Sequence, residues 1–179
     1  WIIYFAVLSG VKQAAFLNVI GTIGKLVPLA IFILVLAISF KVSLFFTDFW
    51  GLKTVVSVHD SALGGLLPQV KSTMLVTLWV FTGIEGAVVV SGRAKSQKDV
   101  GKATFLGFLI CLLLYTALSL LPLGVVPQGT VSKMAPPSTA EVLITVMGKW
   151  GSIIMNVGVI IAILSSWLIW TVMLSELPY

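Results

Sequence analysis

Glu85 stands inside an apolar run of membrane length, and Gly83 and Gly86 lie close on either side of it. A charged side chain at the bilayer centre costs roughly 3 kcal/mol or more, so it persists mostly where it faces a cavity, a partner or a substrate. Glycine-interrupted backbone at membrane depth is tolerated where it lines water or is buried in protein, and it often marks a transporter's binding site. Residues 79–87 therefore predict a transport site.

Two interpretations of the Glu85 carboxylate are open. It could respond to a cationic substrate or a proton, because nearby charge changes the protonation of a buried acid. It could instead be a structural group that is hydrogen-bonded to a neighbouring helix.

Aromatic and polar residues offer further candidates for the same site. Trp79 lies six residues before Glu85, and a tryptophan can hold a guanidinium or ammonium by cation-π attraction of roughly 0.5–2 kcal/mol. The alternative for Trp79 is an aromatic belt at the membrane interface. Ser166 and Trp170 are four residues apart, so both project from one face of the last helix.

Lys25 is a second charge inside an apolar span, beside Gly24 and Pro28. It could snorkel to the interface, or its ammonium could occupy the place of a coupling cation. Gly21 and Gly24 on the same span are small enough to let another helix approach closely.

Composition places the chain among integral membrane proteins. Of its 179 residues 59% are hydrophobic and 9% are charged, and the mean hydropathy is +1.13. The net charge of +5 is not gathered on a polar face suited to nucleic acid. The single cysteine, Cys111, excludes a disulfide framework, and neither a metal site nor a cofactor is expected. Enzyme motifs are absent, and His59 is interpreted as a loop residue.

The apolar runs predict an all-α, polytopic membrane chain that forms one transporter domain over residues 1–179. The expected spans are the end of a helix at 1–8 and four fuller runs at about 18–40, 73–92, 103–126 and 141–174. The spacing of Ser138 and Glu141 is that of a capping box, which predicts the start of the last span. We expect the chain to be an internal piece of a longer protein, because it begins at Trp1 and ends just past an apolar run.

Residues 93–102 form a short loop with four basic side chains. Such loops face the cytoplasm, so we expect a multi-pass protein of the cell inner (plasma) membrane with this loop inside. The lipid bilayer and a small-molecule substrate are the expected partners, and homodimerisation is an open option.

The sequence Trp79-Val80-Phe81-Thr82-Gly83-Ile84-Glu85-Gly86 resembles the broken sixth helix of the amino acid, polyamine and organocation transporter superfamily. Residues 165–171 look like the eighth helix of that superfamily, and residues 176–179 resemble its exit in arginine/ornithine antiporters. The resemblance implies a LeuT-type fold of inverted repeats, of which this chain covers the end of the fourth helix to the eighth.

The resemblance also implies roles for single residues. Trp79 corresponds to an aromatic gate, Glu85 to the acid beneath it and Trp170 to an aromatic platform for the substrate side chain. Ser166 takes a polar position one turn before the platform. Lys25 matches a lysine whose ammonium stands in a sodium-like position in sodium-independent members.

The resemblance also implies that the backbone near Phe81, Thr82 and Gly83 contacts the ligand. Thr82 replaces an aliphatic residue of some arginine/agmatine exchangers, which leaves the side-chain preference open.

The sequence thus predicts amino acid transport by alternating access, with arginine exchanged for ornithine or a related amine. One alternative is a proton-coupled or amine-exchanging permease for lysine, histidine or a neutral amino acid. Another is a membrane scaffold without transport activity, in which Glu85 and Lys25 only join helices.

Overall fold

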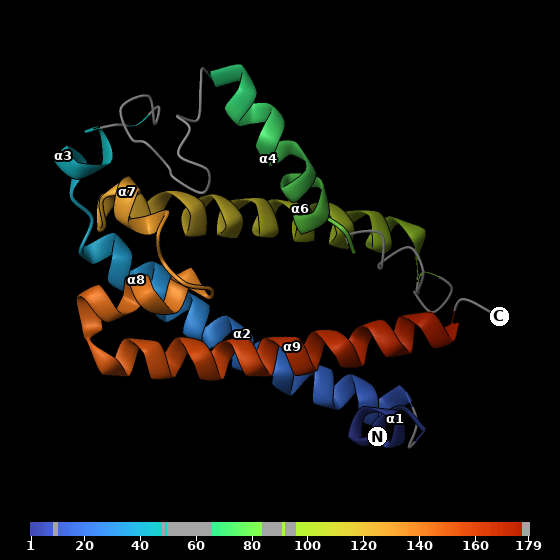
Figure 1. Cartoon of the computed structure of the whole chain (residues 1–179). Helices are drawn as coiled ribbons and strands as arrows, with labels where there is room; N and C mark the ends of the chain where they lie inside the picture. Colours follow the sequence, from blue (N-terminus) through green and yellow to red (C-terminus); the bar gives the residue numbers. More distant parts are fainter. Residues whose placement is uncertain (9–10, 48, 50–65, 84–90, 92–95, 177–179) are drawn as a thin grey trace.

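A computed structural model of the chain describes residues 1–8, 11–47, 49, 66–83, 91 and 96–176, and every regular element among them is helical (Figure 1). The longer helices are α2 (Val11–Ile38), α4 (Leu66–Val80), α6 (Gln97–Leu120), α8 (Ser138–Met147) and α9 (Lys149–Glu176). Short elements complete the order: α1 (Ile2–Leu8), α3 (Val42–Phe45), the 3-10 turn η2 (Leu121–Gly124) and α7 (Gln128–Val131). The all-α class predicted from the sequence is confirmed.

Three of the described helices are long and apolar enough to cross a membrane, over Phe16–Ile38, Lys98–Gly124 and Lys149–Leu174. Many of their large apolar side chains are exposed, among them Ile23 on α2, Phe105 on α6 and Ile163 on α9. Such a surface suits lipid, because hydrocarbon chains solvate it as well as a protein core would.

Helices α2 and α9 form the main helix pair of the described structure, and α2 crosses behind α9 in the view of Figure 1. Gly21 faces Ser165, Gly24 faces Ile161 and Pro28 faces Gly158, so the two helices run antiparallel. The three positions on α2 are three and four residues apart, and so are the three on α9, so each set lies on one face of its helix. A β-carbon on Gly21 would come within 2.6 Å of the Ser165 side chain, so glycine is what permits this distance. The predicted close approach at Gly21 and Gly24 is therefore present.

The seam between α2 and α9 also holds a polar contact. Ser165 is only 5% exposed, and its hydroxyl donates a hydrogen bond of 3.2 Å to Oδ1 of Asn18. The bond joins residues 147 positions apart in the sequence. Polar contacts of this kind between membrane helices contribute about 0.6 kcal/mol on average.

The buried core lies where the end of α2 meets α8 and the start of α9. Phe32 and Leu36 of α2 and Leu143 of α8 are fully buried there, and Met155 of α9 packs with them. This core fixes one end of the α2 and α9 pair, while the candidate site lies toward the other end of α9.

The last predicted span, 141–174, is divided in the structure. Helix α8 ends at Met147, Gly148 adopts a positive φ of 64°, and α9 begins at Lys149. Gly151 then packs against Leu143, where a β-carbon would come within 2.7 Å of the Leu143 carbonyl oxygen. The prediction of one continuous helix was wrong because two glycines allow the chain to turn tightly back on itself.

The start of α8 also differs from the prediction. Pro137, not Ser138, is the N-cap residue, and no side chain caps the helix. Ser138 already lies in the helix, so the Ser138 to Glu141 spacing does not form a capping box. Ser96 does act as a cap at the start of α6, where its hydroxyl accepts a hydrogen bond of 3.2 Å from the Lys98 amide.

Candidate functional site

The candidate site begins where α4 ends. The Phe81 amide donates to the Thr77 carbonyl at 3.3 Å, and the Thr82 amide donates to the Trp79 carbonyl at 3.2 Å. The hydrogen bonds thus tighten from helical to 3-10 spacing over one residue. Gly83 then takes a φ of +103°, which side-chain-bearing residues rarely adopt. The turn at Phe81–Gly83 needs glycine at its last position.

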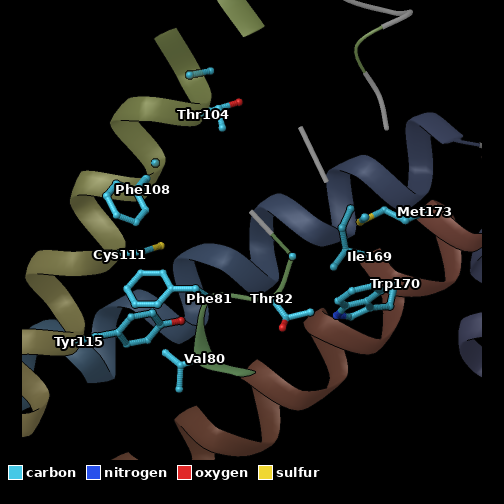
Figure 2. A pocket seen from close by; sticks show the side chains of 13 residues that line it. Val80, Phe81, Thr82, Thr104, Phe108, Cys111, Tyr115, Ile169, Trp170 and Met173 are labelled. Carbon is cyan, nitrogen blue, oxygen red and sulfur yellow. The ribbon is translucent and has the colours of Figure 1, made fainter. Parts of the chain in front are cut away.

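A cavity of about 470 Å³ lies between this turn, α6 and α9 (Figure 2). Cavities of this size suit small-molecule ligands, which occupy roughly 300–1,000 Å³ sites in proteins. The described residues that line it are Val80, Phe81, Thr82, Gly83, Ala103, Thr104, Gly107, Phe108, Cys111, Tyr115, Ile169, Trp170 and Met173.

Helix α6 presents one face to the cavity. Thr104, Phe108, Cys111 and Tyr115 recur at intervals of four, three and four residues, which places them above one another on a helix. Figure 2 shows the side chains of Phe108, Cys111 and Tyr115 projecting from α6 toward the Phe81 ring.

The Phe81 ring joins the end of α4 to α6. Its centroid lies 5.6 Å from that of Tyr115 at an interplanar angle of 89°, an edge-to-face pair. It also lies 5.5 Å from the Phe108 centroid at 41°. Aromatic pairs with such geometry add about 0.5–1.5 kcal/mol each beyond the area they bury.

On the opposite wall the turn approaches Trp170. A β-carbon on Gly83 would lie 3.6 Å from Cζ2 of the Trp170 indole, an ordinary van der Waals distance. Thr82 lies beside the same indole in Figure 2, and its hydroxyl donates to the Leu78 carbonyl at 3.3 Å. The Thr82 oxygen therefore keeps lone pairs with which it can accept a hydrogen bond from a ligand.

The electrostatic character of the cavity comes from π faces and hydroxyl oxygens. None of its described lining residues carries a charge. A cationic ligand would meet the negative faces of Trp170 and Phe81 and the hydroxyl oxygen of Thr82. The arrangement can therefore hold a cation without a carboxylate from the described residues.

A second cavity of about 300 Å³ contains Lys25 and lies between α2, α6 and α9. Most of its lining is apolar, and Lys25 is the one charged residue among the described residues around it. Cys111 and Tyr115 line both cavities. One face of α6 therefore forms a wall that the two cavities share.

The structure brings four of the predicted site residues together: Phe81, Thr82, Gly83 and Trp170 all line the first cavity. Two others lie apart from it. Trp79 is 79% exposed, and Ser166 is half-buried, and neither is among the residues that line this cavity.

Glu85, which the sequence predicts as a site residue, lies outside the described residues, as does His59.

The α6 wall of the cavity is not among the site residues predicted from the sequence. A signal was present, because Thr104, Cys111 and Tyr115 place polar groups at one-face spacing on a largely apolar helix. The structure places Cys111 at the boundary of both cavities.

Three membrane-length helices among the described residues define a multi-pass membrane protein, and the cavity beside the glycine-ended helix α4 gives it a candidate ligand site. The chain belongs to the amino acid permease family, whose model matches residues 1–179. The predicted superfamily resemblance is thereby confirmed, and the name of the family is that of a transporter and not of an enzyme.

Individual relatives are also named as transporters. The whole chain is 80% identical to a Clostridium perfringens protein named "Putative amino-acid transporter", of which it covers 37%. It is 56% identical to an arginine/agmatine antiporter of Chlamydia abortus and 55% identical to one of Chlamydia caviae, covering 36% of each. The chain thus spans little more than a third of the length of these relatives. No solved structure matches it.

Proposed function

We propose that the whole protein exchanges arginine for ornithine or a related amine by alternating access, and that the cavity beside Gly83 receives the amino acid. The observation that carries the proposal is the contact between Gly83, at the end of the turn after α4, and the Trp170 indole, since both residues line the cavity. At this point the turn that follows α4 and the indole ring together form one edge of a small cavity.

Helix ends supply the polar backbone groups that an amino acid needs. The carbonyls at the end of α4 carry partial negative charge, which favours a substrate ammonium. The Trp170 face lies across the cavity, where a guanidinium could stack on it. We assign Phe81, Thr82 and Gly83 to the substrate backbone, and Trp170 to its side chain.

The other predicted residues keep proposed roles. Trp79 and Ser166 would join the site in another conformation of the transport cycle, since neither lines the cavity described here. Glu85 would act as the acid that senses substrate charge, and Lys25 as the fixed cation of the second cavity. These assignments follow from the family motif and the two cavities together.

The membrane arrangement follows from the same interpretation. We place the protein in the plasma membrane with the basic segment 93–102, of which residues 97–102 form the start of α6 and not a loop, on the cytoplasmic side, because short basic segments between spans stay inside. Nucleic acid is not a proposed partner, and a homodimer is the proposed assembly to be tested by size in detergent.

A second exchange pair, arginine against agmatine, is favoured by the names of the Chlamydia relatives. The two pairs differ in charge, because arginine and ornithine each carry one net positive charge and agmatine carries two. Arginine/agmatine exchange therefore moves charge across the membrane, whereas arginine/ornithine exchange does not.

The test is uptake of labelled arginine by proteoliposomes that contain the full-length protein and are preloaded with ornithine, agmatine, lysine or nothing. Uptake that requires internal ornithine and ignores an imposed membrane potential supports the proposal. Uptake that requires agmatine and responds to the potential supports the second pair. Uptake into empty vesicles under a pH gradient would replace both with a proton-coupled permease.

A further inference from the structure

Tyr115 is the described residue at which three features of the site meet. Its ring makes the edge-to-face pair with Phe81, and its side chain lines both the amino acid cavity and the cavity of Lys25. Figure 2 shows its hydroxyl on the side of Phe81. No prediction from the sequence had singled it out.

The position of the Phe81 ring determines where the turn lies. Phe81 and Gly83 are two residues apart, and the Phe81 and Thr82 amides are both bonded back into α4. These two hydrogen bonds restrict the backbone of the turn between Phe81 and Gly83. A displacement of Phe81 would therefore move Gly83 relative to the Trp170 indole, which lies at contact distance.

Phe108 and Tyr115 both contact that ring, with centroids 5.5 and 5.6 Å away, from positions two turns apart on one face of α6. Two contacts restrict the ring more than either one alone. Tyr115 is the member of this pair that also borders the Lys25 cavity.

We propose that Tyr115 is a positioning residue for the amino acid cavity: through the Phe81 ring it sets the distance between the glycine turn and Trp170. The inference rests on the proposed function for the identity of the ligand, although the positioning itself does not depend on that identity. It predicts that the ring of Tyr115 matters more than its hydroxyl.

The transport test compares Tyr115→Leu with Tyr115→Phe in the full-length protein in proteoliposomes. Loss of the ring should raise the KM for arginine about fivefold with little change in the maximal rate, and Tyr115→Phe should restore the original KM. Phe105→Leu is the matched control, because Phe105 is an aromatic residue of α6 that is 65% exposed and lines neither cavity.

A labelling test decides the inference without any transport. Thr82→Cys is made in full-length protein whose other cysteines, Cys111 included, are replaced, and its modification by a water-soluble methanethiosulfonate is followed by mass spectrometry. With the ring of Tyr115 removed, the turn should shift and the labelling rate should change several-fold. Tyr115→Phe and Phe105→Leu should leave the rate as it was.

The two tests separate the two proposals. If the unsubstituted protein takes up no arginine, the proposed function is refuted, and the labelling rates still decide the role of Tyr115. If Tyr115→Leu labels at the same rate as Tyr115→Phe, or if Phe105→Leu changes the rate equally, the positioning role is refuted. An equal rise of KM in Tyr115→Leu and Tyr115→Phe would also overturn it, because the hydroxyl would then carry the effect.

Discussion

Gly83 and Trp170 meet at one edge of the candidate cavity: a β-carbon on Gly83 would stand 3.6 Å from Cζ2 of the indole. The two residues are 87 positions apart in the sequence, one in the turn after α4 and the other within α9. A substrate in the cavity would therefore lie beside this contact, within reach of both the backbone turn and the indole.

Gly83→Ala should impair transport more than its small size suggests. A φ of +103° disfavours any L residue by roughly 1–3 kcal/mol, or about 5-fold to 150-fold in the population of the native turn. We expect a matching loss in the arginine uptake rate at unchanged expression.

Gly101→Ala is the control for Gly83→Ala. Gly101 lies in α6, where no atom stands within 4 Å of the place its β-carbon would take, and alanine favours a helix by about 0.5–1 kcal/mol over glycine. Uptake in this variant should equal that of the parent. Full activity of Gly83→Ala would show that the turn is not needed.

Trp170→Leu should raise the KM for arginine. Removing a cation-π partner worth about 0.5–2 kcal/mol corresponds to a rise of roughly 2-fold to 30-fold. Trp170→Phe should give an intermediate value, since a phenyl ring retains part of the interaction. Concentration series of labelled arginine in proteoliposomes give these constants.

Trp167→Leu is the matched control. Trp167 is 61% exposed and does not line the cavity, although it lies only three residues before Trp170. Its KM should stay at the parental value. An unaltered KM in Trp170→Leu would remove Trp170 from the site.

The sequence was sufficient to predict the elements that follow periodicity and length. The apolar runs indicated helices at α2, α6 and α9, because membrane-length hydrophobicity leaves few alternatives. Gly83 and Gly86 likewise predicted an interruption within the span 73–92, and α4 ends at Val80, just before Gly83, rather than continuing to residue 92. Close approach at Gly21 and Gly24 could be predicted because small residues are what such contacts require.

What depends on the partner helix could not be predicted. The ring of Tyr115 lies 5.6 Å from that of Phe81, in the turn after α4, and no spacing along the chain encodes this contact. The break at Gly148 was missed for a similar reason. A glycine within an apolar run is compatible with a continuous helix. The turn at Gly148 is accompanied by the packing of Gly151 on Leu143, a contact that the sequence does not reveal.

Glu85→Gln should weaken exchange or uncouple it while the protein remains folded in the membrane. The amide keeps the shape of the side chain and removes the charge that a cationic substrate would meet. Arginine exchange is measured over a range of pH beside Asp99→Asn, which neutralises an exposed acid in the first turn of α6. Full exchange with an unchanged pH profile in Glu85→Gln would refute its role.

Lys25→Met should slow exchange several-fold. Methionine preserves much of the length and apolar stem of lysine, so the change removes mainly the positive charge beside the wall formed by Cys111 and Tyr115. Lys25→Arg, which retains the charge, should keep more of the rate. Lys133→Met serves as the control because Lys133 is exposed outside both cavities, and an equal rate in the Lys25 and Lys133 variants would assign Lys25 a structural role only.

Gly21→Ala should destabilise the α2 and α9 pair. Its β-carbon would come within 2.6 Å of both Cβ and Oγ of Ser165, and overpacking of this kind typically costs about 1–3 kcal/mol. The thermal midpoint of the full-length protein in detergent, followed by tryptophan fluorescence, should therefore fall. Gly101→Ala again provides a helical glycine without close neighbours.

Ser165→Gly tests whether the loss comes from this contact. In the Gly21→Ala background it removes the side chain that the new methyl group would meet, so the midpoint should recover most of the difference. Alone, Ser165→Gly should lower stability modestly, since it removes the hydrogen bond to Asn18 and places a second glycine in α9. Additive losses in the double variant would show that Gly21 and Ser165 do not interact, and the antiparallel register of α2 on α9 would then be wrong at this position.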